Sequence, residues 1–309
     1  DGRMDLLEIR HEADGKAVGK QWLGSATGFT EGATIQLGEW HADTQYLLGD
    51  ISGDGKSDLV AVRKREDGKA VASIRLASAD GLVEATELEL GTWIADTRYL
   101  LGDATGDGKA DLWVVSQSAN QKTQVTLWSR DGETFTQGPK AKSNHAWDVG
   151  QQYILSDINR SGRQTLTVVF PSGSTDKTST FIVAEDGTMA MVSDYESFGA
   201  ASRQYLKADV QDDGRDEWIK VYQDAQGVDH LRPSSDDDGN GEWGWSSFKD
   251  IAVGKKAQSR YLAADLNGDG RTDVVQLWRN GAGLAVATAW LSDSNGYVQG
   301  SDSVLGAWR

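Results

Sequence analysis

Acidic loops recur along the chain with the spacing of oxygen ligands around a hard cation. Three segments read Asp-x-(Ser/Thr/Asn)-x-Asp-Gly-x-x-Asp and begin at Asp50, Asp103 and Asp265. Oxygen-bearing side chains occupy every second position, a glycine permits a sharp turn, and a final carboxylate closes the loop. Ca²⁺ takes six to eight oxygens at about 2.3–2.6 Å, whereas Mg²⁺ demands a tighter octahedron and keeps its waters. We therefore expect Ca²⁺ in these loops, with a structural role.

The expected ligands in each loop are four side chains and one backbone carbonyl. They are Asp50, Ser52, Asp54 and Asp58 with the carbonyl of Lys56; Asp103, Thr105, Asp107 and Asp111 with the carbonyl of Lys109; and Asp265, Asn267, Asp269 and Asp273 with the carbonyl of Arg271. A fourth, weaker site is expected at Asp209, Gln211, Asp213 and Glu217 with the carbonyl of Arg215, because the final side chain is longer.

Two further copies of the loop are degenerate. One keeps Asp157 and Asn159 but has Ser161 and Thr165 where carboxylates belong, so we expect it to hold no ion and to rely on hydrogen bonds. Asp1 and Asp5 form half a loop, whose other ligands are expected on a strand that this chain lacks. The twelve carboxylates of the other four loops would repel one another without a cation.

Composition excludes several functional classes. The 309 residues carry a formal net charge of −16 and no cysteine, so disulfides and thiolate metal sites are excluded. The acidity argues against nucleic acid and anionic membranes as partners. No apolar run approaches the roughly 18 residues of a membrane span, and the first residues do not resemble a signal peptide. Because extracellular Ca²⁺ modules bind in the millimolar range, we expect a secreted or cell-surface protein.

A repeat of about 53 residues organises the whole chain. Residues equivalent to Asp54 recur at intervals of 53, 53, 54, 52 and 56 residues from position 1 to position 269. Such self-similarity is the signature of a repeat architecture. The expected units are 1–45, 46–98, 99–152, 153–204, 205–260 and 261–309, and we expect them to form a single domain.

Each unit has the pattern of four β-strands. A Tyr-Leu-Leu-Gly type segment precedes each loop, and apolar residues alternate after it, as at Val60 and Val62, which predicts a strand with one buried face. Further strands are expected near 71–76, 125–128 and 284–291, and near 86–90 and 304–305. Four strands per unit predict a propeller blade. The expected fold is an all-β, six-bladed β-propeller with four-stranded antiparallel blades; the alternative is seven blades, one outside this chain.

The two ends of the sequence fall at different points of the repeat. Residues 305–309 match residues 37–41, and the chain begins inside a loop, so we expect the first blade to lack its inner strand. A small residue ends each inner strand, and we expect bulk there to clash. These small residues are Gly49, Gly102, Ser156, Ala208 and Ala264.

At the acidic loops the chain resembles the FG-GAP-like (VCBS) repeat family, whose blades form the integrin α-subunit head and many secreted propellers. The resemblance spans nearly the whole chain and implies Ca²⁺-binding repeats at 50–58, 103–111, 265–273 and 209–217. The chain departs from the family pattern, because it has Tyr-Leu-Leu-Gly-Asp in place of Phe-Gly and no Gly-Ala-Pro. Integrin-type partner binding is therefore not transferred.

A second landmark is a tryptophan six residues before several of the repeat tyrosines. Trp40, Trp93 and Trp147 share this place, and Asp43 and Asp96 follow the first two by three residues. These tryptophans fit two interpretations, inter-blade core or the rims of repeated sugar pockets. Trp22 and Trp290 raise the same question. The acidic run at 236–242 fits a further cation site, an acidic and aromatic binding lip, or a hairpin insertion.

Catalysis finds no support in the sequence. The four histidines fall at unrelated repeat positions, and neither a His-Glu-x-x-His helix nor a Gly-x-Ser-x-Gly elbow is present. We therefore expect a non-enzymatic recognition or adhesion module that binds glycans or an extracellular protein. The alternative is a structural or docking propeller that serves other domains of a larger secreted toxin or enzyme.

Overall fold

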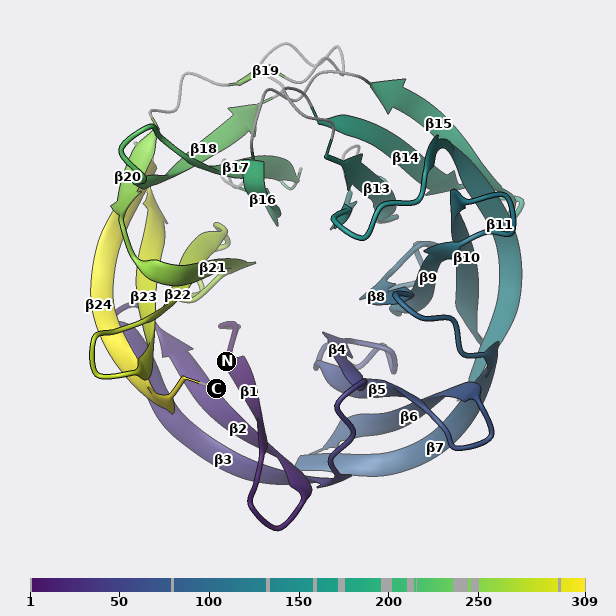
Figure 1. Ribbon diagram of the computed structural model, residues 1–309, viewed down its shortest axis with the longest axis horizontal. Helices are drawn as coiled ribbons and strands as arrows, with labels where there is room; N and C mark the ends of the chain where they lie inside the picture. Colours follow the sequence, from purple (N-terminus) through teal and green to yellow (C-terminus); the bar gives the residue numbers. More distant parts are fainter. Residues whose placement is uncertain are drawn as a thin grey trace. The chain divides into compact units, whose positions relative to one another are not determined.

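The computed structural model describes residues 2–78, 81–131, 134–157, 160–171, 176–195, 202–209, 214, 216–235, 244–245, 250–293 and 296–308. The strands form six antiparallel sheets, and the fold is a six-bladed β-propeller (Figure 1). The predicted fold class is therefore confirmed. The residues that the structure describes include no helix with the length and hydrophobicity needed to span a membrane.

The chain divides into two compact units, which we describe separately. The unit of His11–Ala17 and Leu37–Phe198 contains three four-stranded sheets. They are β4 (Gln45–Gly49), β5 (Asp58–Lys64), β6 (Lys69–Ser78) and β7 (Gly81–Thr92); β8 (Arg98–Gly102), β9 (Asp111–Gln117), β10 (Lys122–Asp131) and β11 (Thr134–Ala146); and β12 (Gln152–Ser156), β13 (Thr165–Phe170), β14 (Lys177–Val183) and β15 (Met189–Tyr195).

The second unit comprises Asp1–Arg10, Val18–Gln36 and Gly199–Arg309. It contains most of the three-stranded sheet of β1 (Leu6–His11), β2 (Lys16–Ser25) and β3 (Gly28–Glu39). It also contains the sheet of β16 (Ser202–Ala208), β17 (Glu217–Gln223) and β18 (Asp229–Ser235), with β19 (Gly244–Trp245) and β20 (Ile251–Gly254) both paired to β18, and the sheet of β21 (Ala257–Ala264), β22 (Asp273–Arg279), β23 (Leu284–Asp293) and β24 (Gly296–Ala307).

The hydrophobic core lies between neighbouring blades rather than inside any one of them. One cluster joins Val60 and Ile74 of the β4–β7 sheet to Leu112 of the next sheet, and another joins Val115 to Leu166 and Phe181. In the other unit, Ile219 and Leu231 pack with Trp290 of the β21–β24 sheet.

The second strand of a blade can be buried on both of its faces. All six residues of β13 are buried, as are the first five of β17. The expectation that these strands bury only one face is therefore wrong. Alternation in the sequence is weak evidence where both faces of a sheet are covered.

The small residue at the end of an inner strand is needed because the next inner strand lies against it. A Cβ atom added to Gly49 would come within 3.1 Å of the Leu101 Cβ and 3.3 Å of the Ala110 Cβ. At Gly102 it would come within 2.3 Å of the Gln164 Oε1 and 2.8 Å of the Leu155 Cδ1. The predicted crowding is present, and its source is the neighbouring blade.

Replacing Gly102 by Ala should lower the free energy of unfolding by about 1–2 kcal/mol, because the Gln164 and Leu155 side chains must move to admit the methyl group. The matched control is Gly281→Ala, since a Cβ there meets nothing within 4 Å. Urea denaturation of both variants makes the comparison. Equal stabilities for the two variants would contradict this packing.

Candidate functional sites: the acidic loops and the tryptophan turns

The last carboxylate of each intact loop is buried and accepts backbone N–H groups from two segments of the blade, so we call it a clip. We number the loop from its first Asp as position 1, so Asp58, Asp111 and Asp273 occupy position 9. All three are at most 1% exposed. The Asp58 Oδ2 accepts the N–H groups of Ile51 and Ser52, both at 3.0 Å, and its Oδ1 accepts that of Ala77 at 2.7 Å. The carboxylate thus ties its own loop to the third strand of its blade.

The same clip recurs in the other two intact loops. Asp111 accepts the N–H groups of Ala104 at 3.0 Å and Arg130 at 2.9 Å. Asp273 accepts those of Leu266 at 2.9 Å and Ser292 at 2.7 Å. Burial, with a smaller contribution from the other two carboxylates of each loop, raises the pKa of Asp111 and of Asp273 to about 6, despite these bonds.

The carboxylate at position 1 shapes the turn. The Asp50 Oδ1 accepts the Gly53 N–H at 2.6 Å, and its Oδ2 accepts the Gly55 N–H at 2.7 Å. Asp103 and Asp265 make the equivalent pairs of bonds to their own glycines. Gly53 and Gly55 have φ angles of 82° and 81°, a left-handed conformation that favours glycine. The Asp-x-x-Gly-Asp-Gly sequence is therefore explained by backbone geometry as well as by any ligand.

The loops also join neighbouring blades. The carbonyl of the position-1 Asp accepts the N–H of the position-8 residue of the following blade. The bonds are Ala110 N to Asp50 O at 2.7 Å, Gln164 N to Asp103 O at 2.6 Å, Thr272 N to Asp209 O at 2.9 Å and Met4 N to Asp265 O at 2.7 Å. The first three bonds join residues about 60 apart in sequence, the fourth joins residues from the two ends of the chain, and the same bond occurs in both units.

The degenerate loops replace these contacts with others. In the fourth copy, the Thr165 hydroxyl donates to the Ser156 carbonyl at 3.0 Å, and Asp157 accepts the Gly162 N–H at 2.7 Å, so this turn is held by hydrogen bonds as predicted. In the fifth copy, Asp209 accepts the Gly214 N–H at 2.8 Å, and Glu217 is buried. The predicted ligands Gln211, Asp213 and Arg215, as well as Asn159 and the 236–242 run, lie outside the described residues.

The loops supply the donor types that Ca²⁺ requires, but their side chains point to backbone amides. In the described part of the chain, no group of three or more Asp, Glu, His or Cys side chains is gathered closely enough to hold a metal ion. An ionised carboxylate has about four acceptor positions, so Asp50 keeps acceptor capacity beyond its amide bonds. Ser52 Oγ lies 3.3 Å from its Oδ1. Ca²⁺ binding would require Asp54 and Asp58 to turn toward the same point.

The repeated tryptophans occupy one kind of turn. Each begins the segment that leaves the last strand of a blade, and each backbone N–H donates to the carbonyl of a hairpin turn in the same blade. These bonds are Trp40 N to Gly15 O at 2.9 Å, Trp93 N to Gly68 O at 3.0 Å, Trp147 N to Gln121 O at 2.8 Å and Trp308 N to Gly283 O at 3.0 Å. We call the segments that start at these residues the tryptophan turns.

The tryptophan side chains are half-buried. Trp93 and Trp147 pack against the core clusters of their unit, whereas Trp40 stacks on His11 with ring centroids 5.1 Å apart and an interplanar angle of 11°. Asp43 and Asp96 are exposed. Trp22 and Trp290 differ, because they are buried and their Nε1–H groups bond to Glu8 and Gln276.

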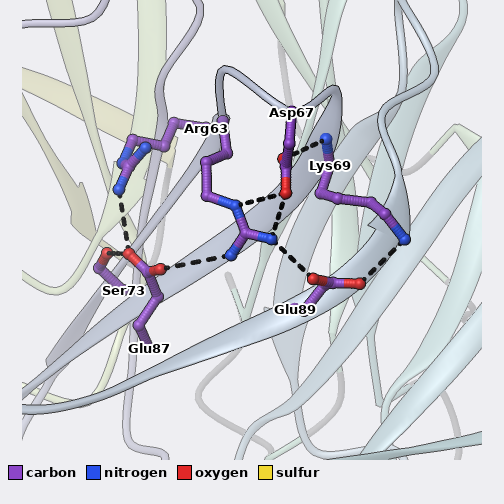
Figure 2. Close-up of polar contacts among 7 residues, drawn as sticks. Arg63, Asp67, Lys69, Ser73, Glu87 and Glu89 are labelled. Carbon is purple, nitrogen blue, oxygen red and sulfur yellow. Dashed lines mark hydrogen bonds and ion pairs between the residues drawn. The ribbon is translucent and has the colours of Figure 1, made fainter.

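A separate polar cluster covers part of the β5–β7 surface (Figure 2). Arg65 contacts Asp67 at 2.6 Å and Glu89 at 2.8 Å, and Glu89 also binds Lys69 at 3.0 Å. Arg63 binds Glu87 at 3.0 Å. Three cations thus face three anions, and these contacts are exposed, so the cluster offers no uncompensated charge to a ligand.

Sequence reasoning missed the side chains that connect adjacent blades. The Gln45 amide donates to the Thr97 carbonyl at 2.7 Å, and the Gln204 amide donates to the Tyr261 carbonyl at 2.6 Å. Arg10 donates to the Leu305 carbonyl at 2.8 Å. The recurrence of Gln before the repeat tyrosine is the one signal that could have revealed the first two contacts.

No protein-family model matches the chain, and no curated protein matches it. Solved structures do resemble it. AofleA from Arthrobotrys oligospora has a TM-score of 0.62 at 10% identity, over 99% of this chain and 84% of that one. A fungal lectin described as a six-bladed β-propeller with a fucose recognition mode, from Aleuria aurantia, has a TM-score of 0.58 at 12% identity, over 99% and 93%. At these identities the likeness establishes the fold.

Proposed function

We propose that this propeller is a non-enzymatic carbohydrate-recognition module whose tryptophan turns bind glycans. The observation that carries the proposal is the repetition of one half-exposed tryptophan, in one turn, by one backbone bond, in successive blades. A flat aromatic ring can stack on the C–H face of a sugar. The exposed carboxylates of Asp43 and Asp96 can accept hydrogen bonds from its hydroxyl groups.

Apolar surface beside the tryptophans supports the same function. Ile94 follows Trp93 and is 45% exposed, and Val149 lies two residues after Trp147 and is 68% exposed. Apolar side chains with a few polar groups among them are typical of small-ligand sites. Two of the tryptophan turns therefore present apolar contact surface beside a half-exposed ring.

The fold likeness gives the first ligand to try. A structure of a mutant Aleuria aurantia lectin in complex with α-methyl-L-fucoside has a TM-score of 0.57 over 99% of this chain. We therefore place L-fucosides first among the probes. Only 10% of the residues are identical, so the choice of this probe rests on the shared arrangement of the blades.

Ca²⁺ stabilisation and an extracellular setting form the second part of the proposal. Three loops carry the full set of oxygen donors, and burial raises the pKa of the position-9 carboxylates Asp111 and Asp273, which a nearby cation would lower. Millimolar Ca²⁺ would fill such loops outside cells. The resemblance to FG-GAP-like repeats supports this part alone, and the recognition surface is assigned to the tryptophan turns.

Replacing Trp93 by Ala should remove one glycan site and leave the others. Titration calorimetry with α-methyl-L-fucoside should show the number of bound sugars falling by one, while the affinity of the remaining sites is unchanged. Trp93→Phe, which keeps a flat ring, should retain the site with an affinity reduced by less than about tenfold. Unchanged stoichiometry in a folded Trp93→Ala variant would exclude this turn as a binding site.

A further inference from the structure

The first blade has an uncovered sheet edge. Five sheets contain an inner strand, which is β4, β8, β12, β16 or β21, paired with the strand that follows the acidic loop. The sheet of β1, β2 and β3 has three strands in the described part of the chain, and β1 is at its edge. An edge strand presents unpaired backbone N–H and C=O groups to any strand that can pair with it.

Burial shows what the missing strand would cover. In β1 the first five residues are half-buried and the last is exposed. In the equivalent strand of the blade that follows, β5, four of the first five residues are buried, and all six are buried in β13. Leu6, Leu7 and Ile9 of β1 are therefore more exposed than their counterparts, although the same repeat encodes them.

The hydrogen bonds of Asp5 give independent evidence that a strand is missing beside β1. Its Oδ1 accepts the Gly24 N–H at 3.0 Å, which is the clip to the third strand seen in the intact blades. In those blades the Oδ2 accepts the N–H of loop position 2, from Ile51, Ala104 or Leu266. Position 2 of the first loop would follow the missing strand, and the Gln21 amide donates to the Asp5 Oδ2 instead, at 2.9 Å.

We propose that the edge of β1 is a docking site for an extended peptide segment with the inner-strand sequence of these repeats, of the type Arg/Gln-Tyr-Leu-Leu-Gly-Asp. Every such segment in the chain already pairs within its own sheet, so the occupant comes from outside these residues. It adds a fourth antiparallel strand beside β1. The N–H that follows its Asp replaces the Gln21 amide on Asp5.

The sequence of the occupant follows from the contacts of the strands that it imitates. Its Gly ends the strand where Gly49 and Gly102 meet the next blade without room for a Cβ. Its Asp carbonyl corresponds in position to the Asp50 carbonyl, which accepts the position-8 N–H of the following blade. A generic hydrophobic strand lacks both features, so the site discriminates by the Gly-Asp end as well as by the apolar residues.

The test is a fluorescein-labelled synthetic peptide that copies residues 97–106, titrated with the protein and followed by anisotropy. We expect saturable binding and, on hydrogen exchange, slower exchange of the β1 amides with no change in β22. The control peptide has Pro in place of the second Leu, which removes a ladder donor and should weaken binding at least tenfold. In a second control peptide, Val and Ala replace the Gly and the Asp, and this change should also weaken binding.

Three results would overturn the proposal: no binding, equal binding of the proline peptide, or protection that falls outside β1. A further check uses Gln21→Ala, which removes the amide that the peptide must displace. That variant should bind the peptide as well as or better than the wild type. A loss of binding would show that Gln21 recognises the peptide and would contradict the proposed exchange of partners on Asp5. Glycan binding is measured separately and does not depend on this edge.

Discussion

Replacing Asp58 by Ala should destabilise the protein by about 3 kcal/mol or more. The variant leaves three amide N–H groups, of Ile51, Ser52 and Ala77, without their acceptor. A buried donor left unsatisfied costs about 1–3 kcal/mol. Domains are stable by only about 5–15 kcal/mol, so this loss is large. Guanidinium denaturation in a chelating buffer measures it without any contribution from bound Ca²⁺.

The matched control is Asp54→Ala in the same loop. Asp54 is exposed, and its Oδ1 accepts the exposed Lys56 N–H at 3.0 Å. In chelator we expect this variant to lose less than about 1 kcal/mol. Similar losses for Asp54→Ala and Asp58→Ala would show that the position-9 carboxylate is not a structural clip.

Removing Ca²⁺ should lower the melting temperature by roughly 5–10 °C. A ligand at one hundred times its Kd stabilises the folded state by about 2.7 kcal/mol per site, and three partly filled loops would together supply a similar or larger amount. Mg²⁺ at the same concentration should restore little of the loss, because it prefers six tightly spaced ligands including water. Calorimetry in 5 mM Ca²⁺, in Mg²⁺ and in chelator provides the measurement.

The Asp54→Ala variant tests the clip and the Ca²⁺ prediction together. It removes a proposed ligand but no buried hydrogen bond, so it should be nearly silent in chelator and clearly destabilising in Ca²⁺. Asp58→Ala should be destabilising in both. Identical melting curves of the wild type in Ca²⁺ and in chelator would contradict the Ca²⁺ proposal and leave the acidic loops with a purely structural role.

The repeat sequence predicted the number of blades because each unit must bury its faces against neighbours of the same kind. It placed Asp50, Asp54 and Asp58 in one loop, but it could not show that Asp58 is buried and bonded to Ala77, which belongs to another strand. That contact depends on how the third strand approaches the loop. Spacing along the chain does not specify this approach.

Contacts between blades were the least predictable part of the structure. The bond from Ala110 to the Asp50 carbonyl joins backbone atoms, so no residue type records it. Trp93 shows a different limit, because its ring belongs partly to the core and partly to the surface. Sequence could not separate the core interpretation from the sugar-rim interpretation, since the same side chain satisfies both.

The most direct test of the recognition function is a glycan array probed with the folded wild-type protein in Ca²⁺-containing buffer. We expect binding to a restricted set of glycans, with fucosylated structures among them, and competition by the free monosaccharide. The same array probed with Trp93→Ala should show weaker signals for the same glycans. A folded protein that binds no glycan on the array would contradict carbohydrate recognition and favour a docking role within a larger polypeptide.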